Sequence, residues 1–386
     1  MATAIRTGDA VAQATPSATT RHAGYLFHPL IDFLLAGGGS MLLAFPIILL
    51  IQDKKAIEAT ALAWGFALSN VLNFPHFANS YQLLYTGIGG RIFGTGSSRK
   101  VRLRYVWAGF VAPVLIGGFM FAAYALGDVR MLSYAANAMA FTTGWHYVKQ
   151  GYGVIAVLSA IRRIYYSEIE KRLLLVNGYV VWIYSWMVLN QTLHEDTLYG
   201  VRFFTFEVPS TLLTIGAGAA VSTTAAVVVA FAVRVLVRKQ SVSWNGVVGY
   251  ASALYLWLLA FHYDLIFAIF IPAFHSLQYL LFTWRYQLNK VSSEFETTAG
   301  PTPAHSRPVL QRFAKFVVGG MVLGWIGFVA LPILFDISLT PDQTMWGPSV
   351  FVFIFVMWIN IHHYFIDNVI WRRDNDDVRK YLFAPR

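Results

Sequence analysis

The feature that most constrains this chain is a series of long apolar blocks between residues 25 and 371. Each block approaches the ~20 residues that a helix needs to cross the ~30 Å hydrocarbon layer of a bilayer. The sequence therefore predicts an all-α, polytopic integral membrane bundle of about ten transmembrane helices. The predicted spans are roughly 25–51, 59–86, 105–127, 131–161, 173–193, 209–233, 244–262, 264–284, 316–335 and 346–371.

Composition excludes a water-soluble globular protein and limits the chemistry. Hydrophobic residues make up 57% of the chain and charged residues only 12%, whereas soluble domains carry about 25% charged residues. There is no cysteine, which excludes disulfides, thiolate metal sites and iron–sulfur clusters. Any metal site must therefore use nitrogen and oxygen ligands.

The distribution of basic residues predicts the orientation in the membrane. With a cytoplasmic N-terminus, 24 of the 29 lysines and arginines fall in cytoplasmic segments, as the positive-inside rule requires. We therefore expect both termini in the cytoplasm, a cell inner-membrane location and no nucleic-acid partner for the net charge of +10. The expected divisions are a disordered cytoplasmic tail at 1–24, a transmembrane domain at 25–371 with a cytoplasmic linker at 286–309, and a basic cytoplasmic tail at 372–386.

Histidines inside the predicted spans are the first functional signal. An ionisable residue in hydrocarbon costs ~2.5–3.5 kcal/mol and is by default a candidate for a functional site. At ~1.5 Å per residue, most of these histidines lie at one depth, in the cytoplasmic half of the bilayer. His146 is deeper, and joins the others only if its helix continues past the membrane surface after Gly151 and Gly153. The histidines in question are His28, His76, His146, His275, His362 and His363.

Two carboxylates inside the predicted spans follow histidines by four residues. Asp32 follows His28, and Asp367 follows His363. Residues four apart share a helix face, so each pair can bind one ion, or the carboxylate can orient the ring. The candidate metal ligands are therefore His28, Asp32, His76, His146, His275, His362, His363 and Asp367.

Lys149 and Tyr279 are the candidate catalytic residues. Lys149 lies three residues after His146 and is either a proton donor or the partner of a buried carboxylate. Tyr279 lies four residues after His275. A packing role at the membrane interface is the alternative for the tyrosine.

Imidazole and carboxylate ligands without thiolate suit iron, zinc or copper. Six histidines exceed the three protein ligands of a catalytic zinc site, so we expect two metal ions, most simply a di-iron site that activates dioxygen. The predicted function is a membrane oxygenase, hydroxylase or desaturase. Its expected partners are membrane lipids, a lipophilic small-molecule substrate and an electron donor from the cytosol.

Three alternatives remain open at this stage. A zinc-dependent membrane lipid hydrolase would use three histidines and a carboxylate to activate water. A haem protein with two axial histidines would pair His76 with His275, or His146 with His362. A transporter would show repeated halves and broken helices, and no repeated halves are visible.

The histidine pattern resembles that of two classes of membrane iron enzyme. Membrane fatty-acid desaturases and hydroxylases are similar in using many histidines at a cytoplasm-facing di-iron site, although their HxxxH and HxxHH boxes are absent here and His362–His363 is the only adjacent pair. Brp/Blh-like carotene-cleaving dioxygenases are similar in taking single histidines from several helices, with His28, His76 and His275 in those places. The resemblance implies iron and an oxygenase activity.

Overall fold

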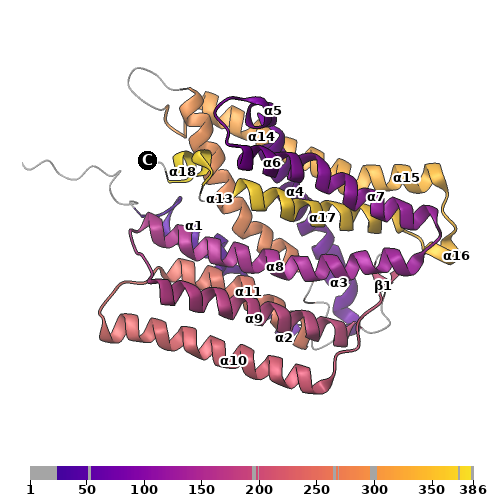
Figure 1. Cartoon of the computed structure of the whole chain (residues 1–386), viewed down its shortest axis with the longest axis horizontal. Coiled ribbons are helices and arrows are strands. Elements are labelled where there is room, and N and C mark those ends of the chain that lie inside the picture. Colours follow the sequence, from indigo (N-terminus) through magenta and orange to yellow (C-terminus); the bar gives the residue numbers. More distant parts are fainter. Residues whose placement is uncertain are drawn as a thin grey trace, which may run out of the picture.

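The computed structural model describes residues 24–50, 54–193, 197–198, 200–263, 267, 269–295, 302–372 and 374–383. These residues form a helical bundle (Figure 1). Its one described β element is a two-stranded antiparallel ladder of β1 (Thr197–Leu198) and β2 (Val201–Arg202). The predicted all-α architecture is therefore confirmed for the described part of the chain.

Seventeen described α-helices follow one another along the chain, and five short π-helical turns interrupt or end them. The α-helices are α1 (Pro29–Phe33), α2 (Gly39–Leu50), α3 (Lys54–Leu68), α4 (Phe74–Tyr85), α5 (Ile88–Phe93), α6 (Arg99–Val106), α7 (Ala112–Ala125), α8 (Val129–Ile161), α9 (Glu168–Thr192), α10 (Ser210–Ala232), α11 (Trp244–Tyr263), α13 (Ile271–Glu294), α14 (Arg307–Trp325), α15 (Leu331–Leu339), α16 (Gln343–Trp346), α17 (Val350–Ile370) and α18 (Asp376–Leu382). The π-helical turns are η2 (Leu34–Gly38), η3 (Ser69–Asn73), η4 (Trp107–Val111), η5 (Val233–Val237) and η6 (Ile326–Ala330).

Five continuous helical segments among the described residues are long and apolar enough to cross a membrane: Arg99–Ala125, Glu168–Thr192, Ser210–Val237, Arg307–Leu339 and Val350–Ile370. The other five predicted spans fall on α1 to α2, α3 to α4, α8, α11 and α13, which do not meet both criteria. Several of these helices carry the histidines and amides, which lower their mean hydropathy. A span count of ten and the orientation of the termini therefore stay predictions.

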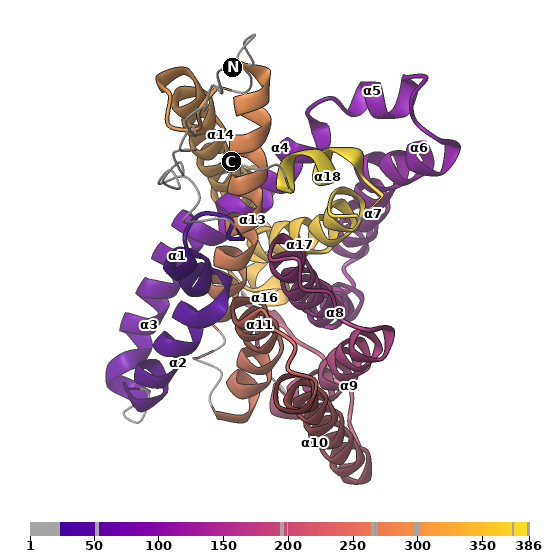
Figure 2. The same ribbon diagram turned by 90° about the vertical axis from the view of Figure 1, so that its left-hand side faces the viewer.

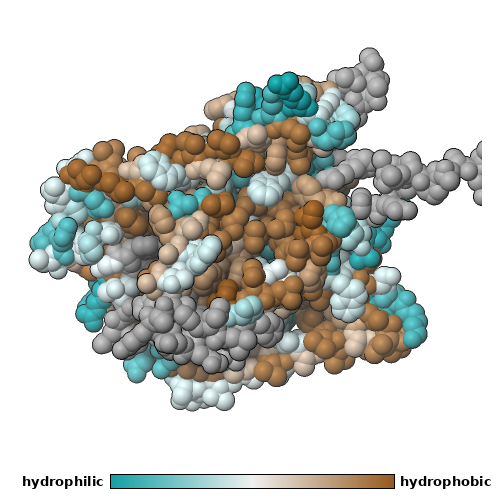
Figure 3. All heavy atoms as spheres, turned by 180° about the vertical axis from the view of Figure 1, so that it is seen from behind, coloured by the Kyte–Doolittle hydropathy of each residue, from teal (hydrophilic) through white to brown (hydrophobic). Residues whose placement is uncertain are grey.

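The surface of the bundle is apolar over large areas. Figure 3 shows hydrophobic side chains covering much of one face of the molecule. The segment Ser210–Val237 has only 11% of its most apolar window buried, whereas Val350–Ile370 has 67% buried. Both segments are apolar enough to cross a membrane, but their burial differs: α10 lies at the periphery of the bundle and α17 lies in its core. Figure 2 shows α17 near the middle of the bundle, between α13 and α8.

The predicted linker and the predicted C-terminal tail both contain helical residues. α13 continues to Glu294, so it includes the first part of the predicted 286–309 linker, while residues 296–301 lie outside the described residues. α18 lies within the predicted basic tail. Val378 and Leu382 are buried in its contact with the bundle, because their spacing of four residues places both on one face.

Close backbone contact fixes α4, the helix that carries His76, against α14. A Cβ atom added to Gly324 of α14 would lie 2.6 Å from the backbone carbonyl carbon of Phe74, and one added to Gly320 would lie 2.2 Å from Oδ1 of Asn79. Small residues let membrane helices approach in this way. The glycines of α14 therefore set the position of the histidine helix.

Gly324→Ala is expected to destabilise the protein by about 1–3 kcal/mol, because the added methyl group meets the backbone of α4 rather than a side chain that can rotate away. Thermal unfolding in detergent measures the effect. Gly118→Ala in α7 is the matched control, since a Cβ there meets nothing within 4 Å. Equal stability of the two variants would contradict the assigned packing of α4 on α14.

Candidate metal centre

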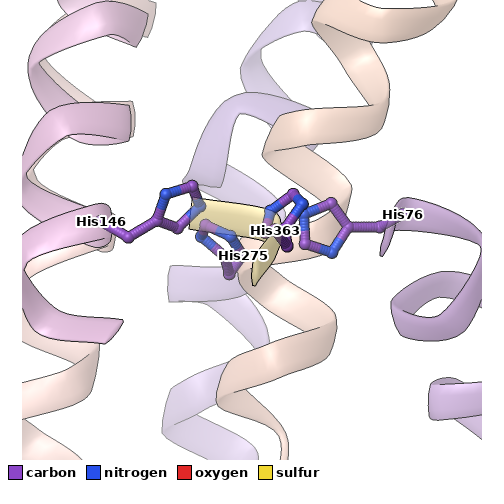
Figure 4. A group of neighbouring side chains, drawn as sticks. All are labelled: His76, His146, His275 and His363. Carbon is purple, nitrogen blue, oxygen red and sulfur yellow. The ribbon is translucent and has the colours of Figure 1, made fainter. Parts of the chain in front are cut away.

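Four histidines from four helices meet in the interior of the bundle. His76 comes from α4, His146 from α8, His275 from α13 and His363 from α17. Their side chains point toward one another from different sides (Figure 4). None is more than 8% exposed. The bundle therefore brings four imidazoles that are far apart in the sequence into one buried group, which we call the four-histidine group.

The rings of the four-histidine group form a closed cycle. Centroids of neighbouring rings lie 5.1 Å apart for His76 and His275, 5.0 Å for His275 and His146, 5.1 Å for His146 and His363, and 4.5 Å for His363 and His76. One nitrogen from each ring can be chosen so that all four lie within 4.8 Å of one another. A histidine nitrogen lies about 2.0–2.1 Å from zinc, so two nitrogens on opposite sides of one ion lie about 4 Å apart. The separation of the nitrogens in the group is close to that value.

Several nitrogens of the group have no hydrogen-bond partner in the protein. They are Nε2 of His76, Nε2 of His146 and both nitrogens of His363. A buried polar atom without a partner costs about 1–3 kcal/mol, so this cluster is unfavourable as simple packing. A bound metal ion would supply the missing interaction for several of these nitrogens at once.

The orientation of His76 is set by a serine on α13. The hydroxyl of Ser276 donates to the carbonyl oxygen of Pro272 at 2.7 Å, and its oxygen lies 3.2 Å from Nδ1 of His76. Because the Ser276 hydroxyl donates its proton to this carbonyl oxygen, its own oxygen accepts from the N–H at Nδ1 of His76. The lone pair of His76 is then on Nε2, the unpartnered nitrogen. Supporting hydrogen bonds of this kind fix the ring and tautomer of metal-binding histidines.

Asp367 lies at the edge of the four-histidine group. Its Oδ2 is 3.2 Å from Nε2 of His363 and 3.8 Å from Nε2 of His146. Its Oδ1 accepts hydrogen bonds from Tyr279 at 3.1 Å and Ser80 at 3.2 Å. The carboxylate is therefore held by two hydroxyls while its other oxygen faces the imidazoles, where it can orient the rings or bind an ion beside them.

Tyr279 is the candidate catalytic residue that the structure brings to the group. Its ring centroid is 4.5 Å from that of His76, and its hydroxyl also hydrogen-bonds Ser80. Lys149 is not brought there. It is exposed, and its Nζ lies 5.6 Å from the ring centroid of Tyr179 on α9, so its long side chain extends toward α9 and away from the four-histidine group.

His362 lies outside the four-histidine group even though it adjoins His363. Adjacent residues of a helix point in different directions, and His362 faces α4 and η4. Its Nε2 lies 2.7 Å from the carbonyl oxygen of Ala108, and its Nδ1 lies 2.7 Å from the hydroxyl of Tyr81. Since a carbonyl can only accept, Nε2 carries the proton and Nδ1 accepts from Tyr81. Both nitrogens are thus occupied, and the predicted role of His362 as a ligand has no support from this geometry.

The predicted pair of His28 and Asp32 caps the first helix and is not part of the group. His28 is exposed, and its Nδ1 accepts from the backbone N–H of Leu30 at 3.2 Å. Asp32 is fully buried and accepts from the N–H groups of Leu26 at 2.5 Å and Phe27 at 3.0 Å. The spacing of four residues therefore ties the incoming chain to the start of α1, where free N–H groups need acceptors.

Two supporting residues, Ser80 and Ser276, were not predicted from the sequence. Ser80 follows His76 by four residues and Ser276 adjoins His275, so helical spacing from a histidine would have been the available signal for Ser80.

The chain matches no protein-family model, no curated protein and no solved structure. The function must therefore be argued from the chemistry of the site. Imidazole nitrogens suit zinc, copper, iron and nickel.

Replacing one histidine of the group by alanine is expected to weaken binding of a divalent metal by more than about 100-fold, because loss of an outer supporting partner alone costs roughly 10–100-fold. Competition with a chelator of known affinity measures the change. The variants are His76→Ala, His146→Ala, His275→Ala and His363→Ala.

The control variant is His262→Ala, which removes an exposed histidine at the end of α11 and should leave metal affinity unchanged. His362→Ala should also retain the metal. Equal losses in these two variants and in the four above would show that the group is not the binding site.

Proposed function

We propose that this protein is a membrane-embedded non-haem iron oxygenase that acts on a lipophilic substrate. The observation that carries the proposal is the four-histidine group, with four buried imidazoles and several nitrogens that have no hydrogen-bond partner in the protein. A redox-active ion at this position would be shielded from water inside an apolar bundle. Such an environment suits oxidation of a substrate that is itself dissolved in the membrane.

The number of nitrogen ligands favours iron over a hydrolytic zinc ion. Zinc in proteins is usually four-coordinate, and catalytic zinc keeps one position for water by using three protein ligands. Four histidines would fill that shell and leave no place for the water that hydrolysis needs. An ion that accepts six ligands keeps two open positions, as non-haem Fe(II) oxygenases require.

Geometry also argues against haem. In a haem protein with two axial histidines, the porphyrin plane separates the two rings and extends well beyond them on all sides. Here each ring of the group has two other imidazoles of the group as neighbours, at centroid distances of 4.5–5.1 Å. The second pair of histidines occupies the space that the macrocycle would need.

One ion is favoured over the di-iron site expected from the sequence. Asp32 and His362 have their ligand atoms engaged by hydrogen bonds elsewhere, and His28 caps α1. That leaves the four histidines as the ligands of one ion, with Asp367 beside them as the group that orients two of the rings. Two closely spaced ions would need additional bridging carboxylates, and no further acidic residue belongs to the group among the described residues.

Tyr279 and Asp367 are the residues suited to proton transfer beside the ion. The phenol donates to Oδ1 of Asp367, and Oδ2 of the same carboxylate faces His363 and His146. A proton released at the phenol therefore has an acceptor already in hydrogen-bond contact. We assign Tyr279 as proton donor and Asp367 as the group that orients the imidazoles and receives the proton.

The proposed location is the cell inner membrane, with the termini in the cytoplasm, because basic residues concentrate in the loops on that side. The metal would then lie in the cytoplasmic half of the bilayer. An acyl or isoprenoid chain could reach it from the lipid.

A transporter that binds a metal only transiently is the remaining alternative, and it would not need open positions on a tightly held ion.

Protein reconstituted with Fe(II) without oxygen is expected to hold about one iron per chain, since four imidazoles form one complete site. Nitric oxide, which binds open positions on ferrous iron, should then give the electron paramagnetic resonance signal of a ferrous nitrosyl. His363→Ala should lose both iron and signal, and His262→Ala should keep both.

Different results would favour different functions. About two irons per chain would favour the di-iron form, and a preference for zinc with activity on ester or amide lipids would favour the hydrolase. Failure of tightly bound iron to take up nitric oxide would contradict an oxygenase, because dioxygen needs the same open position.

A further inference from the structure

A small cavity adjoins the four-histidine group on the side of His275. It lies where α8, α11 and α13 meet, and His275 is one of the residues that line it. Its volume is about 10 Å³, which is close to the about 10–15 Å³ that a single water molecule needs. The cavity therefore admits one small molecule, and not the chain of a lipid, next to a metal-binding imidazole.

The lining of this cavity is mainly apolar. Leu256, Ile271 and Phe274 line it and belong to one hydrophobic cluster together with Tyr147, which lines it as well. The Tyr147 ring stacks on that of His275 at a centroid distance of 4.2 Å. All five of these side chains are buried. A buried apolar cavity takes up an apolar guest more readily than water.

Two polar side chains of the lining, Ser252 and Gln278, are already engaged within the protein. The Gln278 amide donates to the carbonyl oxygen of Ala36 and to the Ser252 hydroxyl, the latter at 2.8 Å. The Ser252 hydroxyl donates to the carbonyl oxygen of Gly249 at 3.2 Å. A buried water molecule makes about three hydrogen bonds, and these two side chains have no proton left to donate to one. A guest that needs no hydrogen bonds is therefore favoured.

The first helical segment is interrupted beside the cavity. The π-helical turn η2 contains Gly37, whose φ of 141° lies in the region that favours glycine. A Cβ atom added to Gly37 would lie 2.0 Å from Oγ of Ser252, so the backbone of η2 lies directly against the lining. π-helical turns within helices are frequent at functional sites. The interruption fixes Ser252 and Gln278 in place, and through them the shape of the cavity.

We propose that this cavity holds dioxygen and supplies it to the metal ion from the side of His275. Dioxygen is apolar and similar in size to a water molecule, so it matches both the lining and the volume of the cavity. This inference rests on the proposed function, and it adds the side from which one of the two substrates arrives. Because a lipid chain does not fit in the cavity, the organic substrate must approach the ion from another side.

Binding of dioxygen in the cavity can be measured without iron, because dioxygen is paramagnetic and broadens the NMR signals of nearby methyl groups. In the metal-free full-length protein, saturation with dioxygen is expected to broaden the methyl signals of Ile271 and Leu256 more than those of Leu254 and Ile370. The latter two are similarly buried but do not line the cavity. Equal broadening of all four residues would overturn the inference, because the cavity would then hold water or nothing.

Filling the cavity tests its role in supply. Ala253→Leu enlarges a side chain of the lining. It is expected to lower about tenfold the stopped-flow rate at which nitric oxide, a diatomic molecule of similar size, binds the ferrous protein, which corresponds to about 1.4 kcal/mol in the activation barrier. Ala251→Leu is the matched control, because Ala251 is also a half-buried alanine of α11 but does not line the cavity. Its rate should equal that of the unchanged protein.

Iron content is measured for both variants, so that loss of the metal is not mistaken for loss of supply. A wild-type rate of nitric oxide binding in iron-loaded Ala253→Leu would overturn this inference alone. A chain that binds no iron would overturn the proposed function, and the methyl signals would still show whether the cavity takes up dioxygen.

Discussion

The structure depends on the convergence of imidazole nitrogens that the protein itself leaves without partners. In a bundle whose exterior is suited to lipid, a buried polar atom without a protein partner cannot form a hydrogen bond with water instead. Nε2 of His76 and of His146 and both nitrogens of His363 are in this condition. A metal ion bound by the four imidazoles would satisfy several of these nitrogens, and imidazole suits zinc, copper, iron and nickel.

The helical architecture and much of the centre could be predicted from the sequence, because both depend on distance along a helix. Rise per residue placed His76, His275 and His363 at similar depth. The depth of His146 differs from that of the other histidines only when its helix is taken to end at the membrane surface, because the sequence does not give the length of that helix. α8 has 33 residues, or about 50 Å at 1.5 Å per residue, so it extends well beyond one bilayer core and its histidine can reach the level of the others.

Direction around each helix, and competition for hydrogen bonds, could not be predicted in this way. His362 shares its depth with His363 but faces the carbonyl group of Ala108 in the π-helical turn η4. The same spacing of four residues that puts Asp367 beside His363 makes Asp32 an acceptor for backbone N–H groups at a helix start. A sequence pattern gives the spacing, whereas the neighbouring backbone decides which donor or acceptor each side chain meets.

X-ray absorption at the iron edge of the reconstituted protein tests the central claim most directly, because it reports the atoms bound to the ion. The account predicts a first shell dominated by about four histidine nitrogens on one iron, with remaining positions filled by exchangeable oxygen ligands. A shell of oxygen atoms with one or two imidazoles, or iron bound only at the surface, would contradict it, because the four-histidine group would then be a packing feature of the bundle.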